Sequence, residues 1–295
     1  MARAALWGGA ALAAALALFA FVGAWEASRI DLGKPASRVP FPTALMRARE
    51  REAREHGLPY RIDCRYVGYD RISPLLRRAV LVAEDDAFFH HGGLDWNEIG
   101  ASARRNLERR RIVRGASTIT QQLARNLYLG EERTFARKLK EVALALRLER
   151  ALSKRRILEL YLNLIEWGDG VFGAEAAAAR YFGRTAATLD ARQALLLAAV
   201  IINPHRFSPL APSPRIERRV RILASRMQRR GQLSDAEYRL AVGEPPEAPG
   251  VALSAAESLG AGAPAETPQA PAMADTALAP AGEAPADTAA PQPPR

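Results

Sequence analysis

The stretch VLVAEDDAFFHHGG, Val80 to Gly93, joins an apolar run to three consecutive carboxylates, two aromatic residues and two histidines. It ends a longer segment that starts SPLLRR, in which Ser73 fits a helix N-cap and Pro74 fits the first helical position. The apolar residues of this segment recur at helical spacing. The pattern therefore predicts a buried helix that ends in a group of ionisable side chains.

Glu84 follows the last apolar turn of this predicted helix, so burial would raise the pKa of its carboxyl group. A carboxyl group of that kind can take or give a proton near neutral pH. The alternative is structural, with the carboxylates ending the helix and stabilised by Arg77 or by amides of the turn. His90 and His91 could suggest a metal, but adjacent histidines rarely bind one ion without further ligands. The stretch by itself leaves the catalytic and structural interpretations open.

Helical patterns continue to about Val242, whereas alternating strand-like segments are scarce. The best strand candidate is YRIDCRYVGYD, residues 60–70. Glycine, a common helix stop, follows three of the predicted helices. After the helix that starts at Pro74, the predicted helices are Ile119–Leu129, Thr134–Leu152, Lys154–Ile165, Ala174–Phe182, Thr188–Ile202 and Pro214–Arg230. The expected fold class is mainly α.

The chain has 295 residues and a net charge of +10, which favours an anionic partner such as nucleic acid, a membrane surface or a phosphorylated substrate. Its single cysteine, Cys64, excludes an intrachain disulfide and a cysteine-based metal site. No P-loop signature is present.

Residues 4–25 carry no charge and are long enough to cross a bilayer as one helix. A cleaved signal peptide is the alternative, although its apolar region would be unusually long. We expect a cytoplasmic end at 1–3, a transmembrane anchor at 4–25, a stalk at 26–54 and a folded domain at 55–243. Residues 244–295 are rich in Pro and Ala and are predicted to be a disordered tail.

Two further stretches combine polar and basic residues. In GASTITQQLARN, Gly115 to Asn126, the spacing of Thr118 and Gln121 fits a capping box, or a helix start that receives phosphate oxygens. In RKLKE, Arg137 and Glu141 share one helix face with Lys138 between them. This face is either an exposed ion-pair group or a basic clamp on a pyrophosphate, with Glu141 orienting the bases or holding a divalent cation.

A fourth stretch, KRRILELYLN (154–163), carries an ordinary core stripe and is interpreted as mostly structural. Together the four stretches resemble the family 51 glycosyltransferases, the peptidoglycan polymerases that extend glycan strands from lipid II. EDDAFFHHGG fits that family's E-D-x-x-F-x-x-H-x-G, and GASTITQQLARN fits G-x-S-T-I-T-Q-Q-x-x-K-N except that Arg125 replaces the usual lysine. RKLKE fits R-K-x-x-E and KRRILELYLN fits K-x-x-I-L-E-x-Y-L-N, while GVFGAEAAAARYFG and INPHRFSPL resemble later family segments. The resemblance covers residues 55 to 230.

The resemblance implies a lysozyme-like, mainly α glycosyltransferase domain behind a single N-terminal transmembrane helix. It implies that Glu84 deprotonates the 4-hydroxyl of the acceptor sugar, which attacks the donor chain with inversion and releases undecaprenyl pyrophosphate. Glu141 matches the second catalytic glutamate, on the pyrophosphate side. No cofactor is certain, but Mg²⁺ or Mn²⁺ is a candidate, with Glu141 as its candidate ligand. The positions that match substrate-binding residues are Asp85, Phe88, His91, Ser117, Thr118, Gln121, Gln122, Arg125, Asn126, Arg137 and Lys138.

The implied partners are lipid II, the growing glycan chain, the membrane and other cell-wall synthesis proteins, with no nucleic acid. The implied location is the inner membrane, crossed once, with the catalytic domain in the periplasm. The basic stretch RRNLERRRIVR, 104–114, is expected to contact anionic headgroups or to form a solvated basic face. A lytic, lysozyme-like enzyme and a catalytically silent membrane scaffold are the alternative functions. Neither S-x-x-K nor K-T-G occurs, so no transpeptidase activity is expected.

Overall fold

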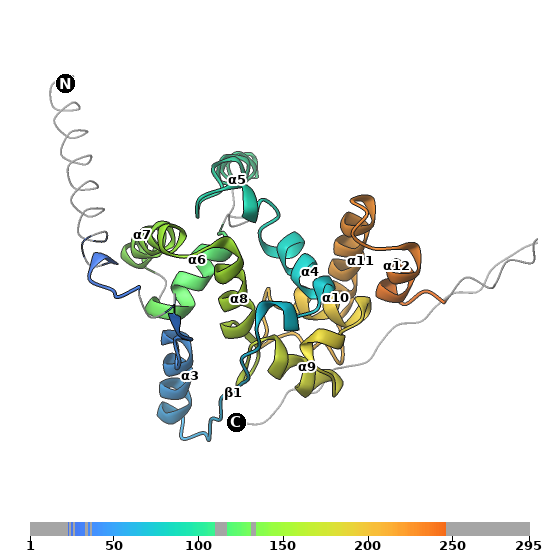
Figure 1. The fold of residues 1–295 in the computed structure, drawn as a ribbon, viewed down its shortest axis with the longest axis horizontal. Coiled ribbons are helices and arrows are strands. Elements are labelled where there is room, and N and C mark those ends of the chain that lie inside the picture. Colours follow the sequence, from blue (N-terminus) through green and yellow to red (C-terminus); the bar gives the residue numbers. More distant parts are fainter. Residues whose placement is uncertain are drawn as a thin grey trace, which may run out of the picture. The chain divides into compact units, whose positions relative to one another are not determined.

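The computed structural model describes residues 37–109, 117–130 and 134–245, together with 23, 25, 27–32 and 35. This part of the chain is mainly helical, as predicted (Figure 1). Its α-helices are α3 (Ala44–Glu55), α4 (Pro74–Glu84), α5 (Trp96–Glu108), α6 (Ile119–Ala124), α7 (Phe135–Ala151), α8 (Lys154–Leu164), α9 (Ala174–Phe182), α10 (Ala191–Val200), α11 (Pro214–Arg229) and α12 (Asp235–Val242). The shorter turns are η1 (Tyr69–Arg71), η2 (Phe88–His90), η3 (Arg125–Leu129) and η4 (Ala186–Thr188), and the strands are β1 (Asp63–Cys64), β2 (Glu166–Gly168) and β3 (Val171–Phe172).

The predicted membrane anchor at 4–25 lies outside the described residues except for positions 23 and 25, and the predicted tail lies outside them beyond residue 245. Within the described segments, no helix has both the length and the apolar character that a membrane crossing needs. The membrane anchor and the disordered tail therefore stay predictions.

Helix α4 begins as the sequence predicts, with Ser73 at the N-cap and Pro74 at the first helical position. One face of α4 is buried, through Leu76, Val80 and its neighbours, and packs against α10 and α11. Every residue of α10 except Arg192 and Gln193 is buried, so this helix lies in the centre of the core. Burying a side chain the size of leucine or valine contributes about 1.5–3 kcal/mol. This packing holds the end of α4, and with it Glu84, in a fixed position.

The predicted helix Ile119–Leu129 changes type along its length. It is α-helical as α6 up to Ala124 and then forms the π-helical turn η3, which Gly130 ends. The Gly130 N–H donates to the Arg125 carbonyl, five residues earlier, at 3.1 Å. A π-turn adds one residue to the repeat and is frequent at functional sites. The apolar pattern of the sequence does not show this turn, although it determines where the Arg125 side chain points.

The segment predicted as a stalk contributes to the core. Helix α3 buries Leu45 and Met46 and packs against η3, and the predicted boundary at 54/55 falls inside its last turn. The segment predicted as a strand, 60–70, forms a strand only at β1, which pairs in parallel with β3, while β2 pairs with β3 in the antiparallel sense. The small sheet has the order β1-β3-β2.

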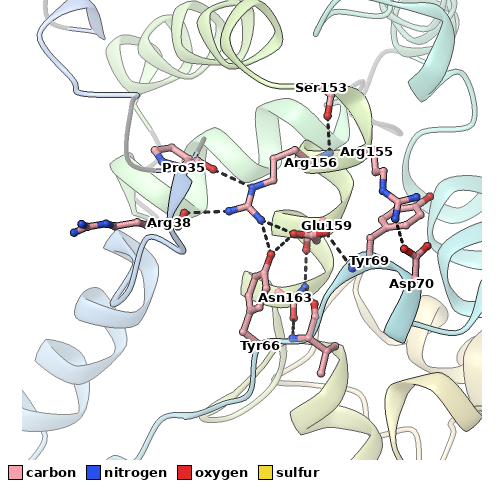
Figure 2. Close-up of polar contacts among 11 residues, drawn as sticks. Pro35, Arg38, Tyr66, Tyr69, Asp70, Ser153, Arg155, Arg156, Glu159 and Asn163 are labelled. Carbon is pink, nitrogen blue, oxygen red and sulfur yellow. Dashed lines mark hydrogen bonds and ion pairs between the residues drawn. The ribbon is translucent and has the colours of Figure 1, made fainter.

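Helix α8 holds the segment that precedes α4, as Figure 2 shows. The Arg156 guanidinium donates to the carbonyls of Pro35, at 3.0 Å, and Arg38, at 3.1 Å. It also donates to the Tyr66 hydroxyl at 2.5 Å and pairs with Glu159. One side chain of α8 therefore fixes three points of the chain upstream of α4.

The remaining polar residues of the fourth stretch are also engaged inside the protein (Figure 2). Glu159 accepts from the Tyr69 N–H at 3.0 Å. Asn163, fully buried, accepts from the Val67 N–H and donates to the Val67 carbonyl, each at 2.9 Å, and donates to the Glu159 carbonyl at 2.8 Å. At Gly173 (φ +85°) a Cβ atom would lie 2.4 Å from the Asn163 carbonyl oxygen, so only glycine fits this approach. The structural interpretation of this stretch is confirmed.

Candidate active site

The Glu84 carboxylate lies at the C-terminal end of α4 and is held by two other helices. Its Oε1 accepts from Arg219 Nη2 of α11 at 2.9 Å, and its Oε2 accepts from Gln122 Nε2 of α6 at 3.1 Å. The side chain is 15% exposed. Desolvation raises the pKa of Glu84, against the opposing effects of Arg219, Gln122 and Arg125, so the predicted direction is confirmed. The stabilising cation is Arg219 and not Arg77, which stacks on the Tyr69 ring.

Gln122 joins Glu84 to the core. Its Oε1 accepts from the Tyr161 hydroxyl of α8 at 2.9 Å while its Nε2 donates to Glu84. Gln122 is predicted as a substrate-binding residue, and both ends of its amide are engaged within the protein.

Asp85, next to Glu84, ties the end of α4 to the start of α6. Its Oδ2 accepts from the Ile119 N–H at 2.9 Å, and its Oδ1 lies 2.9 Å from His91 Nε2. The Gly93 N–H donates to His91 Nδ1 at 3.1 Å, so these contacts need the ring proton on Nε2. Desolvation raises the pKa of Asp85, while the bonds from His91 and Ile119 oppose that rise. Both ring nitrogens of His91 are engaged, which argues against a metal held by the two adjacent histidines.

Three more predicted substrate contacts are buried in the protein. Phe88 is fully buried, with Lys154 Nζ 4.3 Å from its ring centroid. Thr118 and Gln121 form the capping box that their spacing predicts, and the Thr118 hydroxyl also donates to the Gly93 carbonyl at 2.7 Å. The structure thus gives Asp85, Phe88, His91, Thr118 and Gln121 roles in building the site. Their direct contact with substrate stays a prediction.

The second predicted glutamate, Glu141 of α7, is buried between two cations. Arg137 Nη1 lies 2.6 Å from its Oε2, and Lys138 Nζ pairs with its Oε1. Lys138 Nζ also donates to the Ser117 hydroxyl at 2.9 Å. The shared helix face is confirmed, and the ion pairs are buried on the glutamate side. Because both oxygens already bind cations, the residues fit the orienting role of Glu141 and do not fit the metal-holding role.

Two cavities meet the Glu84–Gln122 pair. The first, about 620 Å³, is lined by Glu84, Ser117, Asp86, Asp95, Arg226 and Arg230. The second, about 450 Å³, is lined by Gln122, Arg125, Asn126, Arg137, Arg49 and His205. Glu141 lines neither cavity, but Lys138 links it to Ser117 in the first and Arg137 links it to the second. Glu84 therefore lines one cavity directly, whereas Glu141 reaches the two cavities only through its partners.

The second cavity holds donors that are not satisfied by the protein. The Arg125 side chain has no hydrogen bond or ion pair with any residue that the structure describes, and it is close enough to lower the pKa of Glu84. The Arg137 Nε–H is buried without a partner in the same described segments. Arginine presents a planar fork of donors, whereas lysine would present a point charge. Two guanidinium groups with spare donors at one cavity form a site for an anion such as a phosphate.

Sequence reasoning missed Arg219, Arg49 and the group around Glu166. Arg49 Nη2 lies 3.1 Å and His205 Nε2 lies 2.9 Å from Glu166 Oε2, and this contact with Glu166 raises the pKa of His205. Asp169, Glu166 and His205 have potential metal-ligand atoms within 4.8 Å of one another. Because Arg49 and His205 already bind Glu166, ion pairing accounts for this grouping. Neighbouring residues in the sequence do not indicate these contacts, because each partner comes from a distant segment of the chain.

The basic stretch 104–114 is described only up to Arg109. Its first part lies at the end of α5, where Arg105 pairs with Glu98 at 3.1 Å and Leu107 is 81% exposed. The predicted contact with headgroups stays a prediction.

A buried carboxylate near cations with unpaired donors suits an enzyme that transfers a group to an acceptor and releases an anionic leaving group. In agreement, residues 53–228 match the sequence model of the transglycosylase family, and the chain belongs to this family. Similar proteins include a biosynthetic peptidoglycan transglycosylase of Nitrosomonas eutropha, 45% identical over 188 residues that cover 64% of this chain and 77% of the relative. The protein of the same description from Laribacter hongkongensis is 42% identical over 216 residues, 73% of this chain and 94% of the relative.

Proposed function

We propose that this chain polymerises lipid II into β-1,4-linked glycan strands, with inversion at the anomeric carbon and release of undecaprenyl pyrophosphate. The chain is a peptidoglycan glycosyltransferase by its family and by the names of its relatives. One observation carries the assignment of its site. Glu84, held by Arg219 and Gln122, lines one cavity, while unpaired donors of Arg125 and Arg137 line the neighbouring cavity.

Glu84 acts as the general base in this proposal. The acceptor's 4-hydroxyl is a poor nucleophile at neutral pH, so a nearby base must take its proton as the bond to C1 forms. Burial raises the pKa of Glu84, which makes the carboxylate a better proton acceptor, and the ion pair with Arg219 opposes that rise.

The cations of the second cavity act on the leaving group. Pyrophosphate gathers negative charge as the glycosidic bond breaks, and fixed donors lower the barrier when they meet that charge. Arg125 and Arg137 have donors to spare, and Glu141 orients Arg137 and Lys138 from behind. A divalent cation, when bound, would neutralise part of the same charge through the pyrophosphate oxygens.

The proposal extends to the architecture and the location. It takes the helical domain to be lysozyme-like, anchored by residues 4–25 in the inner membrane, with its catalytic face in the periplasm near membrane-borne lipid II. The uncharged N-terminal stretch supports this placement, as do the exposed Trp96 and Leu107 of α5 beside the basic residues at its end. Other cell-wall synthesis proteins are proposed as partners on the same surface of the membrane.

The alternatives fit the site less well. A lytic enzyme cleaves a glycosidic bond between sugars and has no anionic leaving group that needs Arg125 and Arg137. A silent scaffold has no use for a buried carboxylate whose pKa is raised.

The test uses the purified full-length chain and labelled lipid II in detergent or lipid vesicles. The wild type should form glycan polymer, should leave finished strands uncut and should not be labelled by a fluorescent penicillin. Glu84→Gln should retain the thermal stability of a folded protein and lose polymerisation by about 100- to 10,000-fold, the range of a general base. Glu55→Gln, at the exposed end of α3, is the matched control and should remain active. Normal chain growth by folded Glu84→Gln would overturn the base assignment, and an inactive wild type would overturn the function.

A further inference from the structure

Two consecutive hydrogen bonds connect the core of the protein to the carboxylate of Glu84. The Tyr161 hydroxyl of α8 lies 2.9 Å from Gln122 Oε1 of α6, and Gln122 Nε2 lies 3.1 Å from Glu84 Oε2 of α4. Tyr161 is fully buried. Among the residues that the structure describes, its hydroxyl makes this one hydrogen bond. Each member of the chain of contacts comes from a different helix.

The direction of these hydrogen bonds follows from the donors and acceptors. An ionised carboxylate only accepts, so Gln122 must turn its NH₂ group toward Glu84 and its carbonyl oxygen toward Tyr161. Burial raises the pKa of Tyr161 well above its ordinary value, so the hydroxyl keeps the hydrogen that it donates to Oε1.

The opposite orientation of the amide is unfavourable at both ends. It would bring Gln122 Oε1 against the Glu84 carboxylate, where two acceptors repel each other. It would also replace the acceptor of the buried Tyr161 hydrogen by an NH₂ group, and a buried donor without an acceptor is costly. Tyr161 therefore decides which end of the amide faces Glu84.

We infer that Tyr161 is a positioning residue of the transfer reaction, which locks the Gln122 amide so that it donates a hydrogen bond to ionised Glu84. This inference rests on the proposed function, because Glu84 must act as the base for the lock to affect the rate. The apolar spacing places Tyr161 in a core stripe, and its hydroxyl has a use that this spacing does not require.

Tyr161→Phe tests the inference, since it removes the hydroxyl and keeps the ring. Without the lock the amide can turn over, and Glu84 loses a hydrogen bond to its charged form, which raises its pKa further. As the pH is lowered, activity that needs ionised Glu84 should therefore be lost at a higher pH than in the wild type. The acid limb should shift by about one pH unit for a tenfold change in the proton affinity of Glu84. We expect kcat with lipid II to fall about tenfold near neutral pH and KM to change much less, because the lost bond acts on the base and not on substrate binding.

Two comparisons separate this role from a merely structural one. Tyr181→Phe removes a hydroxyl that donates to the Trp167 carbonyl at 3.2 Å, lies outside the site, and should leave kcat and the acid limb of the pH profile unchanged. In a Gln122→Ala background, Tyr161→Phe should cause no further loss, because residues that act through one another are not additive. Thermal unfolding of each variant reports whether it is folded.

The inference is overturned if folded Tyr161→Phe has the kcat and acid limb of the wild type, or if it lowers kcat equally at every pH. It is also overturned if Tyr161→Phe costs as much in the Gln122→Ala background as in the wild type. These results require a wild type that polymerises lipid II, and failure of the wild type in the same assay refutes the proposed function instead.

Discussion

Arg219 Nη2 of α11 lies 2.9 Å from Oε1 of Glu84 in α4, 135 residues earlier in the chain. The same nitrogen lies 3.3 Å from the Ala83 carbonyl, so Arg219 binds both the last turn of α4 and the carboxylate that follows it. Burial alone would leave Glu84 protonated over a wider pH range and unable to accept a proton. The ion pair opposes that effect, because the positive charge of Arg219 stabilises the charged form of the carboxylate.

Replacing Arg219 by methionine should therefore move the pH dependence of the reaction. The pKa of Glu84 is already raised, and loss of the cation raises it further, by about 1–2 units for a close charge pair. The base is active above its pKa, so the acid limb of kcat/KM should move to higher pH while activity at alkaline pH recovers. Arg218→Met removes an exposed charge from the same helix and should leave the profile in place. A uniform loss at all pH values would contradict this account of Arg219.

The sequence predicted the elements whose ends are set by neighbouring residues. Helix α9 runs from Ala174 to Phe182 before Gly183, as predicted, because a helix stop of this kind acts within one turn. Helix α10 begins later than predicted, since the η4 turn and the capping residue Asp190 take up its expected first turn. The pattern of apolar residues continues through both, so spacing alone could not separate them.

The parts of the site that the sequence did not predict depend on contacts between distant segments. Arg49 of α3 and His205 beyond α10 meet at Glu166, and nothing near any of the three residues signals the meeting. The π-turn at Arg125 is likewise invisible in the spacing, because it depends on how η3 packs against α3. Motif spacing found the two glutamates and the cations that pair with Glu141, whereas Arg219, the cation that pairs with Glu84, comes from another helix and required the fold.

Asn163 should be more important for stability than for chemistry. Its side chain is fully buried and makes two hydrogen bonds that join α8 to the segment before α4, and a third to the Glu159 carbonyl within α8. Asn163→Ala leaves two partly buried backbone groups of Val67 without these partners, at a cost of up to about 1–3 kcal/mol for each. We expect the free energy of unfolding, from denaturant titration, to fall by about 2–4 kcal/mol. Asn97→Ala, at an exposed position of α5, is the control and should be nearly neutral; equal stability of the two variants would show that the Val67 contacts contribute little.

His205 should make stability depend on pH. Its hydrogen bond to Glu166 raises its pKa above the ordinary value of 6.5, so the folded protein holds this proton more tightly than the unfolded chain. The stability that this proton contributes is therefore complete below pH 6.5, and it is lost as the pH rises through the higher pKa of His205 in the folded protein. The ring is partly exposed, so we expect a difference in unfolding free energy of at most about 1 kcal/mol. His205→Gln should destabilise the protein at acid pH and have little effect at alkaline pH; His56→Gln, at the exposed end of α3, should show no such difference.

Glu141→Gln should separate the orienting role of this carboxylate from a metal-holding role. The substitution keeps the shape and removes the charge that neutralises Arg137 and Lys138, both of which bind it directly. The freed cations should bind inorganic pyrophosphate about tenfold more tightly, equivalent to about 1.4 kcal/mol, as measured by calorimetry. Polymerisation should nevertheless slow by at least about tenfold, because the guanidinium is no longer held in one orientation. Glu149→Gln, in the same helix as Glu141, removes a carboxylate that pairs with Lys154 of α8, and it should not change pyrophosphate affinity. The effect of EDTA on the rate should be the same in Glu141→Gln and the wild type. If EDTA inhibits only the wild type, Glu141 binds the metal and the orienting role is wrong.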